Sequence, residues 1–243
     1  MPLVTNSYEG YTTAGTTISA ANSGGNSGTA FDIVGVGSGG TLVSATGAAH
    51  GNFCASLIDT SAASTYMQWT SNGAYGAQTT TNFRLYAKAS ANPGTGVRLF
   101  NNTTAGGSLM SVFLNTTGKL SVTYSSVGTA FVTFTALVPL NSWFRVEGFV
   151  IVSTTVGQVS ASLFSTGLDN PVPDETHTSA ASLNVGTLSG TTSYSFGDSS
   201  AITMTSAILY DDVGLSSFGP LGPAVAPPAP RATLTAVSRS ANW

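Results

Sequence analysis

The ionisable side chains of this chain are few and widely spaced. Among 243 residues there are ten acids, seven lysines and arginines, two histidines and one cysteine, so only 7% of the chain is charged, against roughly 25% in an average soluble domain. The acids are Glu9, Asp32, Asp59, Glu147, Asp169, Asp174, Glu175, Asp198, Asp211 and Asp212. The few places where such groups cluster therefore decide what chemistry the chain could do.

No catalytic motif is recognisable among these residues. His50 and His177 stand far apart, and neither has the spacing of a metal-binding or nucleophile-activating pair. Cys54 follows His50 closely, but nothing in the sequence would orient the imidazole, and a small buried side chain is the favoured role for this cysteine. Glycoside hydrolysis needs two carboxylates at a defined separation. Glu147 is the best single candidate, but an ion pair with Arg145 along one strand is favoured, and we predict that the chain is not an enzyme.

Calcium binding is the more credible chemistry, because this ion takes several oxygen ligands, some of them carboxylates. Acids gather in the loop Asp169-Asn170-Pro-Val-Pro-Asp174-Glu175 and in the pair Asp211-Asp212, which is expected at the end of a strand. Asp and Asn also favour ordinary turns, so solvated turns are the favoured alternative for both places.

The composition argues against two classes of partner. The net charge is −3 and the basic residues are scattered, so no patch is available to neutralise a phosphate backbone. No apolar run approaches the ~20 residues of a membrane span, and the first residues lack the basic and apolar regions of a signal peptide. We expect a protein made in a cytoplasm that binds neither nucleic acid nor membrane.

Short runs rich in Val, Ile, Thr and aromatic residues recur from Phe31 onward, with Gly, Asn and Ser between them. In the run 143–152, apolar residues alternate along one face, which is typical of antiparallel strands with one buried face. No window keeps a helical period. The predicted fold is all-β, a two-sheet antiparallel jelly-roll sandwich. Its strands are expected at 31–36, 53–57, 66–69, 83–88, 97–100, 110–114, 119–124, 131–135, 143–152, 159–164, 193–196 and 202–210.

The ends of the chain differ from this pattern. Residues 1–30 are predicted to be an extended lead-in with the first strand, and residues 8–222 to be the sandwich domain. Residues 223–243 are predicted to be a Pro-rich linker and an extended C-terminal arm, because their prolines cannot sit in central strands. The low charge favours self-association, and we expect the 224–243 segment to dock on neighbouring subunits.

Four stretches carry a resemblance. The opening Asn6-Ser-Tyr-Glu-Gly10, the segment 22–32, the strand Asn141-Ser-Trp-Phe-Arg-Val-Glu147 and the sequel Ala207-Ile-Leu-Tyr-Asp-Asp-Val213 follow one another in order. Together they resemble concanavalin A-like (laminin-G-like) jelly-roll proteins of tailed actinobacterial phages. The resemblance spans about residues 8–222.

The resemblance implies that the first and last strands are neighbours, which would bring Glu9 near Asp211 and Asp212, where related jelly rolls hold calcium. These three residues are the candidate metal ligands. The family includes sugar binders, phage tail components and capsid-associated proteins. Together with the low charge, the lack of a catalytic motif and the Pro-rich arm, the resemblance leads us to expect a virion protein of the phage tail or tail tip, assembled in the host cytoplasm. Its expected partners are other virion proteins and copies of itself, with a host-surface glycan as a candidate ligand. A capsid decoration protein and a carbohydrate-active enzyme or binding module are the alternatives.

Overall fold

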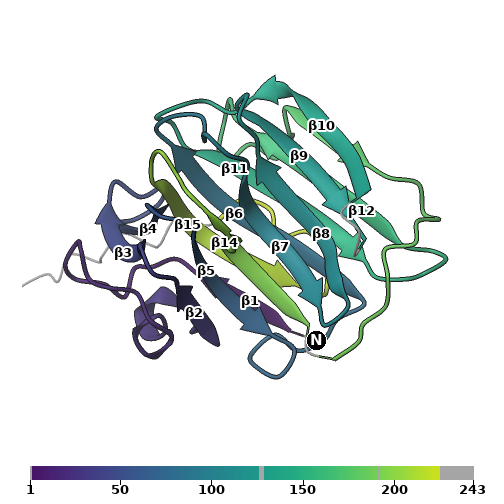
Figure 1. Cartoon of the computed structure of the whole chain (residues 1–243), viewed down its shortest axis with the longest axis horizontal. Helices are drawn as coiled ribbons and strands as arrows, with labels where there is room; N and C mark the ends of the chain where they lie inside the picture. The colour runs from purple at the N-terminus through teal and green to yellow at the C-terminus, as the bar shows by residue number, and fades with distance from the viewer. Residues whose placement is uncertain (1, 126–128, 191, 225–243) are drawn as a thin grey trace, which may run out of the picture.

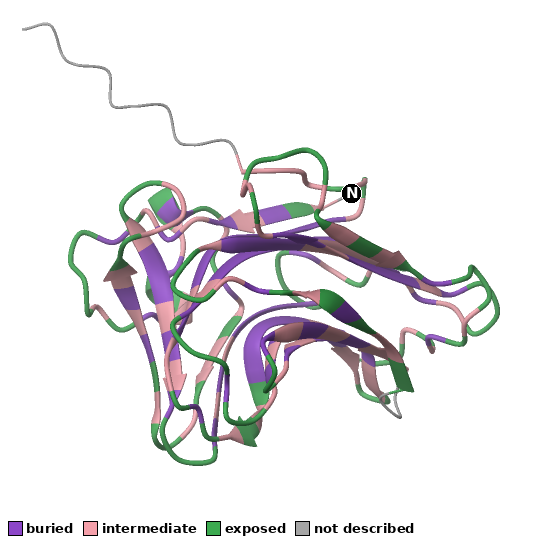
Figure 2. Ribbon diagram, turned by 90° about the horizontal axis from the view of Figure 1, so that it is seen from above, coloured by how far each residue is buried: buried purple, intermediate pink, exposed green. Residues whose placement is uncertain are grey.

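Two stacked antiparallel sheets form the molecule, as seen in a computed structural model that describes residues 2–125, 129–190 and 192–224 (Figures 1 and 2). The helical elements of these residues are two short 3-10 turns, η1 (Ala20–Asn22) and η2 (Gly25–Ser27). None of the described helices is long and apolar enough to cross a membrane. The all-β sandwich predicted from the alternating pattern is confirmed.

The first sheet, here sheet A, carries the residues that matter below. Its strands are β1 (Leu3–Asn6), β3 (Gly40–Thr46), β4 (Phe53–Asp59), β6 (Thr80–Ala89), β11 (Phe144–Ile151), β12 (Gln158–Phe164), β13 (Glu175–Thr178) and β15 (Ile208–Ser216). They lie in the order β13-β12-β11-β6-β15-β4-β3, and β1 pairs with the end of β15. The first and last strands are therefore neighbours, as the family resemblance implied.

The second sheet, sheet B, covers the inner face of sheet A. Its strands are β2 (Ile33–Val36), β5 (Ala63–Thr70), β7 (Val97–Thr104), β8 (Gly107–Leu114), β9 (Lys119–Tyr124), β10 (Thr129–Leu137) and β14 (Ser193–Ile202). They lie in the order β10-β9-β8-β7-β14-β5-β2.

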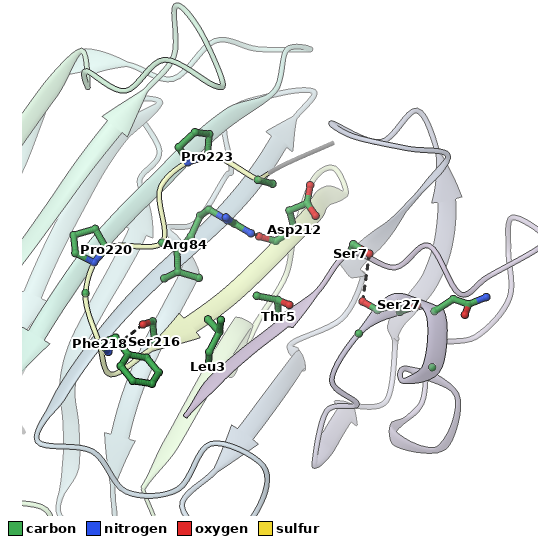
Figure 3. Close-up of a pocket in the computed structure, with 16 residues that line it drawn as sticks. Leu3, Thr5, Ser7, Ser27, Arg84, Asp212, Ser216, Phe218, Pro220 and Pro223 are labelled. Carbon is green, nitrogen blue, oxygen red and sulfur yellow. Dashed lines mark hydrogen bonds between the residues drawn. The ribbon is translucent and has the colours of Figure 1, made fainter. Parts of the chain in front are cut away.

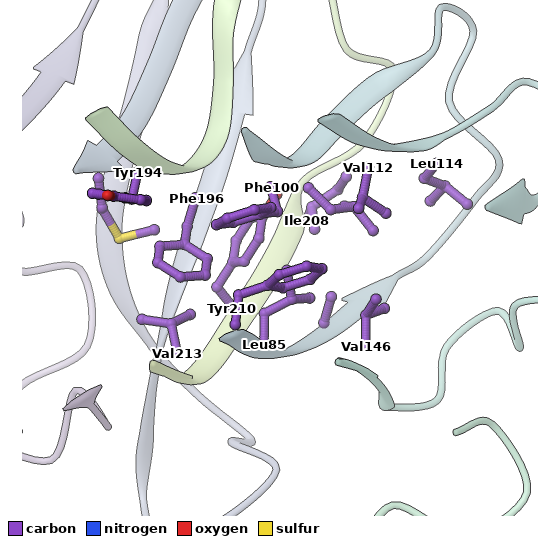
Figure 4. Packing of buried hydrophobic residues seen from close by; sticks show 14 of the residues in the cluster. Leu85, Phe100, Val112, Leu114, Val146, Tyr194, Phe196, Ile208, Tyr210 and Val213 are labelled. Atoms are coloured by element: carbon purple, nitrogen blue, oxygen red, sulfur yellow. The ribbon is translucent and has the colours of Figure 1, made fainter. Parts of the chain in front are cut away.

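The core lies between the sheets and is rich in aromatic side chains (Figure 4). Phe83 of sheet A stacks on Phe100 of sheet B with ring centroids 4.0 Å apart, and Phe196 packs against Phe100 at 5.6 Å. The alternating residues Phe144, Val146 and Val150 of β11 are all buried, as their spacing predicted. Burying such a side chain stabilises the fold by roughly 1.5–3 kcal/mol, so this layer holds the two sheets together.

Two strands were not predicted, and one was misplaced. β3 and β13 consist largely of Gly, Ser, Thr and other small or polar residues, so they carry weak alternation. The predicted strand 202–210 is wrong, because β14 runs to Ile202 and β15 begins at Ile208. β15 also continues through the acidic pair, where its register with β6 shifts between Asp211 and Gly214. The C-terminal arm predicted at 223–243 lies outside the described residues from position 225 onward.

Candidate functional site

The outer face of sheet A carries a row of charged and polar side chains. In β6, Phe83, Leu85 and Ala87 are buried in the core, so the alternating Arg84 and Tyr86 point to the opposite face. Their cross-strand neighbours on β11 are Glu147 and Arg145, respectively. Arg84, Tyr86 and Arg145 are nevertheless buried. Loops therefore cover this face of the sheet.

Arg145 anchors the first of these loops, which joins β12 to β13. Its guanidinium donates to the carbonyl oxygens of Leu168 and, at 2.8 Å, of Asn170, and it lies 3.7 Å from the centre of the Phe164 ring. The Nε atom of Arg145 lies 2.9 Å from Glu147 Oε1, so the ion pair favoured from the sequence is present. Burial raises the pKa of Glu147, and the positive charge of Arg145 opposes that rise.

A second loop, between β3 and β4, brings His50 to the acidic pair of β15. His50 Nδ1 lies 2.6 Å from Asp212 Oδ2, and Nε2 lies 3.1 Å from Asp169 Oδ2. The hydroxyl of Tyr86 donates to the other oxygen of Asp169 at 3.0 Å. The expectation that nothing orients His50 is therefore wrong. Its partners are 119 and 162 residues away along the chain, a separation that motif spacing does not reveal.

The two acids of β15 have different surroundings because the backbone between them is irregular. Asp212 has a φ of 42°, in the left-handed region, at the shift of register with β6. Asp211 accepts hydrogen bonds from the backbone N–H groups of Ala49, His50 and Asp212 at 2.8–3.0 Å. Burial raises the pKa of both aspartates, and the hydrogen bond with His50 opposes the rise at Asp212. Burial thus makes both carboxyl groups weaker acids than an exposed aspartate, which suits a group that takes up a proton.

Glu9 approaches the same corner from the other side. Its Oε1 accepts hydrogen bonds at 2.8 Å from the backbone N–H groups of Asn52 and Phe53. Within the described chain, the acids and histidines that could share a metal ion are His50, Asp211 and Asp212, with donor atoms within 4.8 Å of one another. Glu9 does not join this group. An imidazole is not a ligand that calcium favours, and both oxygens of Asp211 already accept N–H groups, so the cluster fits calcium poorly. Calcium at Glu9, Asp211 and Asp212 stays a prediction.

The acids of the loop 169–175 do not gather at one point. Asp169 faces His50 and Tyr86. Asp174 accepts from Thr166 and Ser165, and these hydrogen bonds, chiefly that of the Thr166 hydroxyl, lower its pKa to about 2. Glu175 accepts from two backbone N–H groups of β10 and pairs with His177 at 2.7 Å. These carboxylates fasten loops and strands; Glu175 belongs to strand β13 rather than to a turn.

A groove opens beside the acidic pair. It has a volume of about 690 Å³ and lies between β1, η2 and the segment Phe218–Ala224. Figure 3 shows Arg84 and Asp212 between that segment and β1, with Phe218 at the opposite end. Polar side chains of Thr5, Ser7 and Ser216 complete the lining, and the Phe218 side chain is 66% exposed. The volume is that of a typical small-ligand site.

Comparison with solved structures finds the same fold at low sequence identity. No protein-family model and no curated protein matches the chain. The endo-β-1,4-glucuronan lyase of the fungus Trichoderma reesei is 13% identical, with a TM-score of 0.56 over 77% of this chain and 91% of the lyase. The PL-14 alginate lyase of Aplysia kurodai is 12% identical, with a TM-score of 0.53 over 72% and 86%. Trypanosoma rangeli sialidase is 12% identical, with a TM-score of 0.52 over 88% of this chain but 30% of the sialidase.

The TM-scores establish a shared fold, and two consequences follow. The prediction that the chain is not an enzyme is contradicted, because the same sandwich makes up most of two polysaccharide lyases. That prediction rested on motif spacing and low charge, and neither shows which residues the fold brings together, such as His50 with Asp169 and Asp212. The phage assignment, the virion location and the protein partners are not addressed by these structures and stay predictions.

Proposed function

We propose that this chain is a carbohydrate-active enzyme that binds an acidic polysaccharide in the groove and cleaves it by β-elimination. The observation that carries the proposal is that a buried cation, Arg84, and a buried acid of raised pKa, Asp212, line one groove. The shared fold with lyases that act on glucuronan and alginate supports the same class of substrate.

Arg84 is held in a fixed position for the carboxylate of a uronic acid. Its Nε donates to the backbone oxygen of Asp212 at 3.1 Å, and its Nη1 donates to that of Gly222 at 3.0 Å. A fixed guanidinium in a water-poor site binds a carboxylate strongly. It also stabilises the negative charge that builds up there when the neighbouring carbon loses its proton.

Asp212 is the proposed base. Its carboxylate takes the proton from C5 of the uronate, the C–H electron pair forms the C4–C5 double bond, and the C4–O bond breaks. The electron pair of that bond leaves with the oxygen, which then takes the proton back from Asp212. His50, at 2.6 Å, positions this carboxylate, and Phe218 offers an exposed ring on which a sugar can stack.

The test is depolymerisation of polyglucuronate and alginate, with a neutral glucan for comparison. The reaction is monitored by the ultraviolet absorbance of the unsaturated product. Asp212→Asn should abolish cleavage and retain binding, since Asn also tolerates the left-handed backbone at this position. Arg84→Gln should weaken binding of acidic polymers by about ten-fold or more, because a charged hydrogen bond is lost. Asp174→Asn and Lys119→Gln, which lie outside the groove, are the matched controls.

Three results would count against the proposal. Wild-type protein that neither binds nor cleaves an acidic polymer would refute it. Binding without cleavage would remove the elimination chemistry and leave the groove as a binding site. Equal effects of Asp212→Asn and Asp174→Asn would show that Asp212 has no special role.

The virion location is a separate proposal, supported by the resemblance of residues 8–222 to phage jelly rolls. Electron microscopy of antibody-labelled particles tests it. Label on tails supports a tail protein, label on heads supports a decoration protein, and label on neither contradicts both.

A further inference from the structure

The outer face of sheet A carries two cavities, and one short segment separates them. The groove with Arg84 and Asp212 lies on one side of Phe218–Ala224. A smaller pocket of about 210 Å³ lies on the other side, lined by Glu147, Phe149, Phe164 and Pro173 among others. Pro220 lines both. The two cavities are therefore neighbours on the same sheet face.

Backbone groups of the segment form hydrogen bonds with polar side chains of sheet A. The oxygen of Gly222 accepts from Arg84, and the N–H of Ala224 donates to the Tyr86 hydroxyl at 2.9 Å. A hydrogen bond from the Gly222 backbone also partly offsets the burial that raises the pKa of Glu147. Main-chain groups thus fill positions that a bound ligand's hydroxyl or carboxylate groups could equally fill.

The segment's further contacts are few: the N–H of Phe218 donates to the Ser216 hydroxyl at 3.1 Å, and the half-buried Leu221 lies beside Gly214 of β15. The segment pairs with no strand of the described structure, and its Phe218 ring is largely exposed. Gly219 and Gly222 each have open space where a side chain would be. A segment with few buried apolar contacts and no sheet hydrogen bonds opens at low free energy.

We propose that Phe218–Ala224 is a displaceable strap, and that beneath it the groove and the Glu147 pocket join into one longer saccharide-binding cleft. This inference rests on the proposed function. Phe149, which is half-buried at the pocket, would stack against a sugar ring. Glu147, whose charge is balanced by Arg145, would accept hydrogen bonds from hydroxyl groups. A short saccharide fills the groove alone, whereas a long one must move the strap.

Gly222→Ala is the probe, in the full-length chain. Gly222 has a φ of +66° and open space where a methyl group would stand, so an alanine there strains the closed strap without a clash. The left-handed conformation disfavours alanine enough to raise the open fraction roughly ten-fold. Gly15→Ala is the matched control, because Gly15 also has a positive φ of 83° and open space, at the far end of the chain.

Calorimetry with a glucuronate disaccharide and hexasaccharide gives the first measurement. We expect Gly222→Ala to bind the hexasaccharide up to about ten-fold more tightly, and the disaccharide no more tightly than the wild type does because Arg84 loses the Gly222 carbonyl, with no effect of Gly15→Ala. Phe149→Ala in the Gly222→Ala background should remove the gain. If the wild type and Gly222→Ala bind the hexasaccharide with equal affinity, the longer cleft is refuted. Binding of the disaccharide in the same experiment would show that the proposed function still stands. Failure of every form to bind either sugar would refute both.

Amide hydrogen exchange gives a measurement that needs no ligand. The amides of Leu221, Gly222 and Ala224 should exchange much faster than those of β6 in the wild type and roughly ten-fold faster again in Gly222→Ala. Exchange as slow as that of β6, or unchanged by the substitution, would show that the segment is a fixed part of the fold and would overturn the strap.

Discussion

The ion pair between buried Arg145 and Glu147, whose side chain is 13% exposed, allows a prediction whose magnitude follows from the structure. In Arg145→Met, the side chain keeps an apolar stem but loses its charge. Arg145 is only 1% exposed, and its Nε lies 2.9 Å from Glu147 Oε1. The substitution would leave Glu147 with the weaker influence of Arg84 alone among its cations, and would remove the Arg145 donor from the carbonyls of Leu168 and Asn170. Removing one member of a buried pair costs about 3–5 kcal/mol, whereas an exposed pair contributes about 0–1 kcal/mol.

The loss should depend on pH in a defined direction. Burial already raises the pKa of Glu147 in the folded protein, and the positive charge of Arg145 opposes that rise. Without Arg145 the folded-state pKa rises further. A folded-state pKa above the unfolded value means that stability is lost as pH rises, so the variant should lose most stability near neutral pH. The difference from the wild type should shrink as pH falls toward the unfolded pKa of about 4.3.

Urea unfolding at pH 7 and at about pH 4.5 measures both effects. The double variant Arg145→Met/Glu147→Gln is the control, since it removes both charges and should recover a large part of the loss at pH 7. A loss below about 1 kcal/mol that is the same at both pH values would refute the reasoning, because the pair would then behave like a solvated one.

Three further predictions concern the core, the metal and the assembly. Phe100→Ala should lower the free energy of unfolding by about 3–5 kcal/mol, because its ring stacks on Phe83 at 4.0 Å and leaves a cavity; a loss below about 1 kcal/mol would contradict the packing. If calcium binds at Glu9, Asp211 and Asp212, adding it at a hundredfold excess over its Kd should stabilise the fold by about 2.7 kcal/mol, and an unchanged melting temperature on adding chelator would reject the metal. If the 224–243 segment mediates self-association, sedimentation equilibrium should show oligomers of the full chain and monomers after its removal. Monomers in both cases would contradict that role.

The sheet framework was predictable where packing imposes a period of two residues. In β11, Phe144, Val146 and Val150 alternate because one face of the strand meets the core, and the sequence showed this strand within one residue at each end. β13 shows the opposite case. Among the described strands it pairs with β12 alone, at the edge of sheet A, and it consists of Glu-Thr-His-Thr, so it buries too little apolar surface to leave a pattern.

The candidate site was predictable only in part. The family resemblance implied that the first and last strands are neighbours, and this pointed to the corner where Glu9, Asp211 and Asp212 lie. His50 was missed because its contact with Asp212 joins residues 162 positions apart. Tyr86 and Arg84 were missed for a different reason. They alternate with core residues of β6, and the sequence does not show that loops would bury the outer face of the strand.

The irregularity at Asp212 explains how two consecutive acids acquire separate roles. In a regular strand, neighbouring side chains point to opposite faces, so one member of the pair would enter the core. Here the shift of register between Asp211 and Gly214, with a positive φ at Asp212, lets Val213 take the core position. Asp211 can then fasten the loop at Ala49 and His50, while Asp212 reaches the groove beside Arg84. Because a left-handed backbone is tolerated by Asp and Asn but disfavours a β-branched residue, this one position couples the local chain geometry to the proposed chemistry.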